Sequence, residues 1–320
     1  MQINEYKGCI KMTKVFVDGS SGTTGLKILD RLSIRNDIEL IKLDDALRKD
    51  VDAKTDAINS ADIVFLCLPD QAAIEAANLV HNNHTVVIDT STAHRVDETW
   101  VYGFEEILNS KEIIKNATKI ANPGCHASGF LSLVAPLTHA HLIDNDTALT
   151  CFSLTGYTGG GKKMINQYEN EKTFDLEAPR QYGLSQSHKH IPEMVKYAGL
   201  TQAPIFSPIV GDFAQGMQVT VPLFKKDLKG SVKDIIDVYK ATYTGKLVHF
   251  DSEDEQGFIS ANKYAGYDDM GVSVFGNDER ILLVSRFDNL GKGASGAAIQ
   301  NMNIVMGLDE TTSLNIKGAN

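Results

Sequence analysis

The chain has 320 residues, of which 42% are hydrophobic and 22% charged, and its formal net charge is −10 at pH 7. This length allows two domains, this composition is typical of a globular protein, and the negative charge argues against a nucleic-acid partner. The longest continuous apolar run covers only residues 63–68, which is far too short to cross a bilayer, so we expect no membrane partner.

The cysteines and the N-terminus bear on location. The four cysteines have neither the spacing of metal ligands nor the density of a disulfide scaffold. Residues 1–12 contain no apolar signal core and read as an N-terminal extension. We therefore expect a protein of the reducing cytoplasm that holds no metal. The cysteines are Cys9, Cys67, Cys125 and Cys151.

The first third of the chain alternates strand-like and helix-like segments. Such alternation predicts βαβ units with a parallel sheet, and hence an α/β, doubly wound Rossmann domain. The strands are expected at Lys14–Asp18, Ile38–Leu43, Ile63–Leu68, Thr85–Asp89 and Thr118–Ala121. The helices are expected at Leu26–Leu32, Ala46–Ser60 and Asp70–Val80.

The pattern changes after Cys125. An apolar helix is expected over Ala127–Ala140, and the strands beyond it are longer and more widely separated. This predicts an α+β domain with a mainly antiparallel sheet, followed by a small-residue-rich helix over Ala294–Leu308. The clearest strands are Ala148–Leu154, Gln218–Phe224 and Ile281–Phe287.

A glycine-rich loop joins the first predicted strand to the first helix. Gly19, Gly22 and Gly25 recur at intervals of three, although Ser20 occupies the position of the second glycine in G-x-G-x-x-G. Glycine lets the backbone approach a pyrophosphate, and the N–H groups at the helix start would bind its charge. The alternative is a tight turn with no ligand. Hydroxyls that could also bond phosphate belong to Ser20, Ser21, Thr23 and Thr24.

The end of the second strand leaves the choice of nicotinamide cofactor open. Asp44 could bind the ribose 2′-hydroxyl of NAD, whereas Arg48 and Lys49 could pair with the 2′-phosphate of NADP. All three could equally lie on a solvated loop.

A cysteine follows the segment Asn122-Pro123-Gly124, where a buried strand is expected to become a helix. Pro123 fixes φ and Gly124 relaxes it, so the chain changes direction abruptly. Cys125 would then lie in the first helical turn, where the macrodipole lowers a thiol pKa and favours a nucleophile. The alternative is a buried cysteine that packs as a small hydrophobe.

Two histidines, His188 and His190, precede Pro192-Glu193. One of them could act as acid or base beside Cys125, with Glu193 orienting a ring. Metal ligation is conceivable, but no further cysteine or histidine cluster supports it. Surface histidines without a role are the alternative.

Three other segments combine polar groups with turns. Arg95 ends the segment after the fourth strand, and its planar guanidinium could bind a carboxylate or a phosphate. The alternative is an exposed arginine on a loop. The segment 156–163 places Lys162 beside glycines and suits an anion, or is a sharp turn. The segment 289–296 is a second glycine-rich loop, or packs a helix on a sheet.

Taken together, these segments resemble N-acetyl-gamma-glutamyl-phosphate reductases of the shorter form. The resemblance covers nearly the whole chain after the first dozen residues. It rests on the order of the motifs, which are Val15–Gly19, Cys67–Asp70, Asp89–Arg95, Asn122–Cys125, Ser153–Lys162, His188–Glu193, Gly211–Met217 and Asn289–Met302.

The resemblance implies NADPH-dependent reduction of N-acetyl-L-glutamyl 5-phosphate to the 5-semialdehyde, in arginine biosynthesis. It places the nucleophile at Cys125 and a base at His188 or His190. We expect the acyl-phosphate substrate to be bound by Ser91, His94, Arg95, Asn122, Gly159, Lys162 and Glu193. We expect NADP to be bound by Gly19, Ser20, Ser21, Gly22, Thr23, Thr24, Gly25, Arg48, Leu68, Pro69, Asn289 and Gly291.

The resemblance also implies a domain division and an assembly. Residues 13–122 and 288–320 would form the dinucleotide-binding domain, residues 123–287 the catalytic and oligomerisation domain, and the protein would be a homo-oligomer. His126 stands where the family is expected to have tyrosine. The remaining alternatives are an aspartate-semialdehyde dehydrogenase-like enzyme, a cysteine hydrolase, and a non-catalytic NAD(P)-binding sensor.

Overall fold

The computed structural model describes residues 12–317. The expected N-terminal extension therefore lies outside the described residues, apart from Met12, and so does the end of the C-terminal segment. Within the described part, no helix combines the length and the apolar character needed to cross a membrane.

The first half of the molecule is built on six parallel strands in the order β2-β1-β3-β4-β6-β5. The strand order reverses between β1 and β3, which is where ligands bind in such sheets. The strands are β1 (Thr13–Asp18), β2 (Ile38–Ile41), β3 (Ile63–Leu66), β4 (Val86–Asp89), β5 (Val101–Tyr102) and β6 (Lys119–Ala121).

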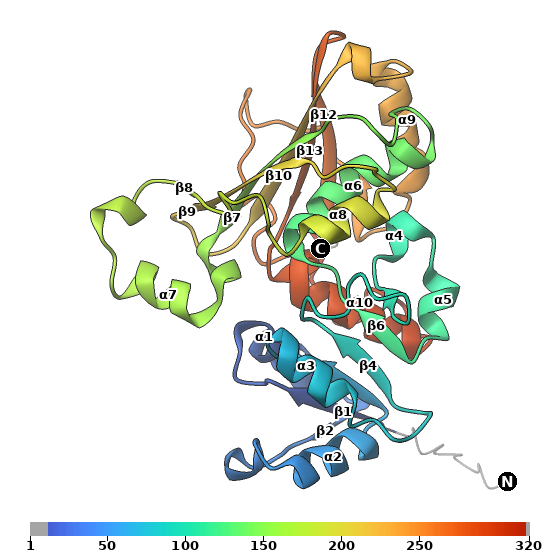
Figure 1. The fold of residues 1–320 in the computed structure, drawn as a ribbon, viewed down its shortest axis with the longest axis vertical. Helices are drawn as coiled ribbons and strands as arrows, with labels where there is room; N and C mark the ends of the chain where they lie inside the picture. Colours follow the sequence, from blue (N-terminus) through green and yellow to red (C-terminus); the bar gives the residue numbers. More distant parts are fainter. Residues whose placement is uncertain (1–11, 318–320) are drawn as a thin grey trace, which may run out of the picture.

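Helices cover both faces of this sheet (Figure 1). One face packs on α1 (Thr23–Ser33) and on the C-terminal helix α10 (Gly296–Val305), the other on α2 (Val51–Ser60) and α3 (Asp70–Ala77). Successive strand residues point to opposite faces, so the sheet is doubly wound as predicted. Two short helices, α4 (Glu105–Leu108) and α5 (Lys111–Lys115), precede β6.

The second half is a seven-stranded mixed sheet in the order β11-β12-β13-β10-β7-β9-β8. Four of its pairings are antiparallel and two are parallel, so the predicted α+β fold with a mainly antiparallel sheet is confirmed. The strands are β7 (Thr150–Gly156), β8 (Arg180–Gln181), β9 (Ile205–Gly211), β10 (Met217–Phe224), β11 (Val248–Phe250), β12 (Met270–Gly276) and β13 (Arg280–Phe287).

Helix α6 (Cys125–His139) packs along one face of the mixed sheet and is buried over nearly its whole length. Its flanking helices are α8 (Ile191–Tyr197) and α9 (Val232–Thr242), while α7 (Gly161–Glu169) projects from the far end of β7 (Figure 1). One-turn segments lie at Asp45–Leu47, Tyr157–Gly160, Phe174–Leu176 and Lys225–Asp227, and a π-helical turn at Gly291–Ser295 leads into α10.

A buried ion pair joins the two halves. Arg31 of α1 donates from Nη2 to Asp268 Oδ1 at 2.6 Å, and the Asp268 carboxylate is fully buried. Its second oxygen also accepts the backbone N–H of Asn315 at 2.9 Å. The helix that follows the glycine-rich loop is thereby held against the chain that leads into β12.

One predicted helix is wrong. The continuous helix expected over Ala46–Ser60 is a single 3₁₀ turn, a break, and then α2 from Val51. The break follows from Asp50, whose side chain accepts the N–H of Ala53 and caps a new helix. The structure also begins α6 at Cys125, two residues before the expected start.

A glycine in α6 yields a test of this packing. A Cβ at Gly129 would lie 2.3 Å from Val219 Cγ2 and 2.9 Å from Phe287 Cε1, so Gly129→Ala must push the helix off the sheet. We expect the free energy of unfolding to fall by about 1–3 kcal/mol in urea titrations. Gly245→Ala is the control, because open space surrounds Gly245, and it should change stability by less than about 0.5 kcal/mol. Equal stability of the two variants would contradict the packing.

Candidate active site

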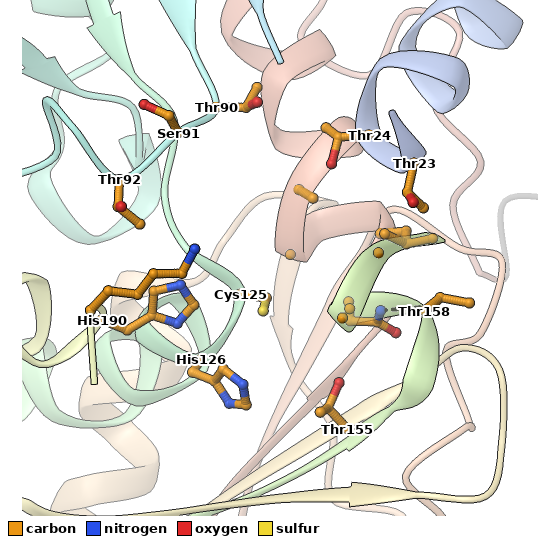
Figure 2. Close-up of a pocket in the computed structure, with 18 of the residues that line it drawn as sticks. Thr23, Thr24, Thr90, Ser91, Thr92, Cys125, His126, Thr155, Thr158 and His190 are labelled. Atoms are coloured by element: carbon orange, nitrogen blue, oxygen red, sulfur yellow. Dashed lines mark hydrogen bonds between the residues drawn. The ribbon is translucent and has the colours of Figure 1, made fainter. Parts of the chain in front are cut away.

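A cavity of about 530 Å³ lies between the two halves, at the carboxyl ends of the parallel strands and beside the start of α6. Cys125 faces this cavity, with His126 and His190 to one side and Thr158 to the other (Figure 2). Thr23 and Thr24, at the start of α1, line it from the side of the parallel sheet. The cavity thus brings the cysteine, the histidines and the glycine-rich loop into one space.

The turn before Cys125 has no room for a side chain at Gly124. A Cβ at Gly124 would lie 2.3 Å from Arg95 Nη1, 2.7 Å from His190 Nε2 and 2.8 Å from Glu193 Oε1. The backbone N–H of Gly124 donates to Glu193 Oε2 at 3.0 Å. Glycine at this position therefore lets the turn before Cys125 approach the side chains of Arg95, His190 and Glu193 at once.

The expectation of a lowered thiol pKa at Cys125 is wrong. Burial raises its pKa to about 11, against the opposing effects of the Arg95 guanidinium and the His126 N–H. The thiol is therefore neutral near pH 7, and it would act as a nucleophile only beside a base that accepts its proton. The dipole argument from the sequence did not include the loss of water that accompanies burial of the turn.

Two histidines that could act as a base lie near the Cys125 sulfur. The Cys125 sulfur and one nitrogen each of His126 and His190 all lie within 4.8 Å of one another. Burial, followed by the charge of Arg95, holds the pKa of His190 well below its usual range, so this ring is neutral and can accept a proton. His188 packs edge-on against His190 at a centroid distance of 4.9 Å, and burial lowers its pKa too.

The carboxylate of Glu193 does not orient a histidine ring. It is buried and accepts hydrogen bonds from Arg95 Nη1 at 2.9 Å, from the Tyr102 hydroxyl at 2.8 Å and from the Gly124 N–H. Arg95 also donates to the carbonyls of Asn122 and Thr90, both at 3.0 Å. Glu193 therefore lies behind the cavity wall and supports Arg95, which lines it.

His94 is likewise behind the wall. Its ring stacks on Trp100 at 4.0 Å, and its Nδ1 lies 2.7 Å from Asp89 Oδ2. The same carboxylate oxygen accepts the Ser91 hydroxyl at 2.7 Å. Of the three substrate-binding residues predicted in this segment, Ser91 and Arg95 line the cavity, and His94 does not.

The glycine-rich loop divides between two cavities. Gly22, Thr23 and Thr24 line the first, whereas Gly19, Ser20 and Ser21 line a second cavity of about 740 Å³ over the ends of β1 and β2. Gly19 has φ +82°, and a Cβ there would lie 2.2 Å from the carbonyl oxygen of Cys67. Gly25 lines neither cavity, because it packs inside α1 against the Gly19 carbonyl.

The second cavity is lined by the side chains that would determine the preference for NAD or NADP. Asp44, Arg48 and Lys49 all line it, together with Leu68, which also lines the first cavity. One further observation fits a dinucleotide at this loop. The hydroxyl oxygen of Thr23 is buried with no partner within the described part of the chain.

Some of the remaining predicted site residues line the first cavity and others do not. Pro69, Asn122, Gly159 and Asn289 line the first cavity, whereas Lys162 and Gly291 do not. Gly291 is a packing residue, because a Cβ there would lie 2.1 Å from the Tyr267 carbonyl oxygen.

Several residues that line the cavity were not among the predicted site residues. They are Thr155, Tyr182, Lys189 and the side chain of His126. Lys189 could have been found, since it lies between two predicted histidines. Thr155 and Tyr182 reach the site through the pairing of β7, β8 and β9, which a single sequence does not reveal.

Comparisons with known proteins agree with this architecture. A family model described as the NAD binding domain of semialdehyde dehydrogenase matches residues 38–116, and one described as its dimerisation domain matches residues 125–289. Among solved structures, aspartate semialdehyde dehydrogenase II of Vibrio cholerae, complexed with ASA, matches with a TM-score of 0.71 and 16% identity, over 92% of this chain and 98% of that one. The Candida albicans enzyme with NADP has a TM-score of 0.62 at 15% identity, over 92% and 99%. These identities show a shared fold alone.

Closer relatives are curated proteins named N-acetyl-gamma-glutamyl-phosphate reductase. The protein of Sinorhizobium medicae (strain WSM419) is 43% identical over 305 residues, which cover 92% of this chain and 98% of that protein. The protein of Brucella suis (strain ATCC 23445 / NCTC 10510) is 44% identical over 315 residues, with 92% and 99% covered. Since relatives this similar span nearly the full length of both chains, the chain belongs to the N-acetyl-gamma-glutamyl-phosphate reductase family.

Proposed function

We propose that this protein reduces N-acetyl-L-glutamyl 5-phosphate to N-acetyl-L-glutamate 5-semialdehyde with NADPH, a step of arginine biosynthesis, through a thioester on Cys125. One observation carries the proposal beyond family membership. The Cys125 sulfur lies within 4.8 Å of a nitrogen of the neutral His190, in a cavity whose opposite wall is the glycine-rich loop.

Acylation follows from the neutral pair. His190 accepts the thiol proton of Cys125 as the sulfur attacks the acyl carbon, and phosphate leaves with the electrons of the broken C–O bond. Ionising the two groups together is easier than ionising either alone, because thiolate and imidazolium attract each other. Arg95 and Lys189 line the same cavity and would neutralise the charge of the phosphate or the carboxylate.

NADPH, when bound along the glycine-rich loop, supplies the hydride that reduces the thioester carbonyl. Backbone N–H groups at the start of α6 would stabilise the oxyanion that forms on Cys125. Collapse of this adduct releases the aldehyde and the thiolate, which recovers the proton held on His190. Gly19, Thr23 and Thr24 would hold the dinucleotide, with Arg48 at its 2′-phosphate.

A non-catalytic NAD(P)-binding sensor is the second reading, and the raised pKa of Cys125 favours it. The reverse reaction separates the two. With N-acetylglutamate semialdehyde, phosphate and NADP, we expect formation of NADPH, and aspartate semialdehyde should give much less. Cofactor binding without turnover of either aldehyde would favour the sensor, and turnover of aspartate semialdehyde alone would reassign the substrate.

Assembly and location belong to the same proposal. The outer face of the mixed sheet exposes Phe152, Ile205, Phe224 and Leu282, on four adjacent strands. An apolar face of this kind is typical of a protein interface, so we place a second copy of the chain on it. We place the enzyme in the cytoplasm, since a catalytic thiol needs a reducing compartment.

Cys125→Ser should lower reductive turnover by about 10³-fold or more, because serine is a far weaker nucleophile than a thiol beside a neutral base. NADPH binding, followed by fluorescence, should remain. The matched control is Cys151→Ala, which removes a buried thiol from β7 away from the cavity. Near-normal turnover by Cys125→Ser would disprove the covalent route.

Removing the base should change the pH dependence. Because the pKa of His190 is lowered, the wild-type kcat/KM should be level from about pH 6 to about pH 8. In His190→Asn the rate should follow the thiolate fraction and rise about tenfold per pH unit toward the pKa of Cys125, about 11. His188→Asn serves as the comparison, and the same steep profile in that variant instead would assign the base to His188.

Arg48→Ala should raise the KM for NADPH by about 10- to 100-fold, because a charge-assisted contact to the 2′-phosphate is worth about 1.5–3 kcal/mol. The KM for NADH in the same variant is the internal control and should change by less than about threefold. Steady-state kinetics with both cofactors decide this. A parallel loss with NADH would show that Arg48 supports the loop rather than the phosphate.

A further inference from the structure

The nucleophile is one of three metal-ligand side chains that converge on the cavity. Cys125 offers a sulfur, His126 and His190 offer imidazole nitrogens, and these three atoms lie within 4.8 Å of one another. Because the three residues come from two distant segments that meet only in the fold, this complete ligand set could not be predicted from the sequence. Sulfur and imidazole together suit zinc and similar divalent ions rather than Mg²⁺ or Ca²⁺.

His126 is already held as metal-ligating histidines are held. Its Nδ1 lies 2.7 Å from Ser153 Oγ, and its Nε2 lies 2.7 Å from the Tyr182 hydroxyl. When Nδ1–H donates to Ser153, Nε2 accepts the hydroxyl of Tyr182, which also lines the cavity, so a bound metal would replace Tyr182 on this lone pair. A hydrogen bond from the second nitrogen fixes the tautomer and ring orientation in most histidine–metal sites.

His190 provides a second, independent observation. Its ring is buried, and its Nδ1 has no hydrogen-bond partner within residues 12–317. An unpaired polar atom in such a position is costly unless something binds it. The ring also packs against that of His126, at a centroid distance of 5.4 Å, so the two donors are already close.

We propose that Cys125, His126 and His190 bind one zinc-like divalent cation, whose fourth coordination position opens into the cavity. Binding exchanges the thiol proton of Cys125 for the metal, releases that proton to solvent, and leaves both imidazoles neutral. The three donors must draw together by roughly 1 Å to reach tetrahedral geometry, given Zn–S and Zn–N bonds of about 2.3 and 2.1 Å.

The consequence for activity rests on the proposed function, although the site itself does not. A metal on Cys125 removes the nucleophile, so bound zinc would inhibit the reductase reversibly. Lys189 and Arg95 both line the same cavity and oppose a cation, although Arg95 is paired with Glu193. We therefore expect regulation by free metal rather than a permanent structural zinc.

Cobalt titration of the full chain tests the site directly. Added Co²⁺ should give a thiolate-to-cobalt charge-transfer absorption that saturates at one ion per chain and disappears when Zn²⁺ is added. The same ions should protect Cys125 from alkylation, as followed by mass spectrometry of its peptide. Mg²⁺ should do neither. Absence of the absorption in the wild type would overturn the proposal.

Variants identify the donors. Cys125→Ser should abolish the charge-transfer absorption, and His126→Tyr should raise the Kd for Co²⁺ at least about tenfold. His81→Asn, which removes an exposed histidine, is the matched control and should leave the titration unchanged. An unchanged Kd in His126→Tyr would remove His126 from the site and overturn the three-donor proposal. Melting curves verify that each variant is folded. Protection of wild-type Cys125 from alkylation tests the site independently, because it needs no variant.

The metal site and the proposed function can fail separately. Turnover of the acyl phosphate without cobalt binding would reject the metal site alone. Cobalt binding without turnover of either aldehyde would keep the site and reject the reductase.

Discussion

The site depends on the hydrogen bonds that the buried carboxylate of Glu193 accepts. It comes from α8 of the second half, yet it binds Arg95 and Tyr102 of the first half and the backbone of Gly124 between them. Removing one partner of such a buried pair costs about 3–5 kcal/mol, because the other charge is left without compensation. The two halves are therefore joined at the turn that carries Cys125, the proposed nucleophile.

A second constraint acts on Cys125 from the C-terminal segment. The π-helical turn Gly291–Ser295 runs beside the start of α6, and a Cβ at Gly293 would lie 2.9 Å from the Cβ of Cys125. Lys292 in this turn is buried, and its ammonium lies 2.5 Å from oxygens of both Glu106 and Gln300. The π turn thus lets Gly293 face Cys125 while its neighbour Lys292 is anchored on the opposite side, and such turns are common at functional sites.

Much of this could be predicted from the sequence, because the signals are local. Strand–helix alternation predicted the parallel sheet, and Pro123-Gly124 before an apolar helix predicted where Cys125 would lie. What could not be predicted depends on contacts between distant segments. The position of Glu193 behind Arg95, of His94 on Trp100 and of His126 beside His190 follows only from the packing of the two halves.

The ionisation state of Cys125 also could not be predicted from the sequence, because it too depends on how distant segments pack. A helix start favours the thiolate, and a sequence reveals the helix start, but burial of the completed turn acts in the opposite direction and prevails. In the proposed mechanism the resting pair of Cys125 and His190 is therefore neutral, and the chemistry depends on His190 rather than on a preformed thiolate.

Trapping the acyl enzyme tests the central claim most directly. With N-acetylglutamate semialdehyde and NADP but no phosphate, oxidation should stop at the thioester. Mass spectrometry should then find one N-acetylglutamyl group on the peptide that carries Cys125, which is lost when phosphate is added. An enzyme that turns over with phosphate yet shows no such adduct, or carries it on another residue, would contradict the account.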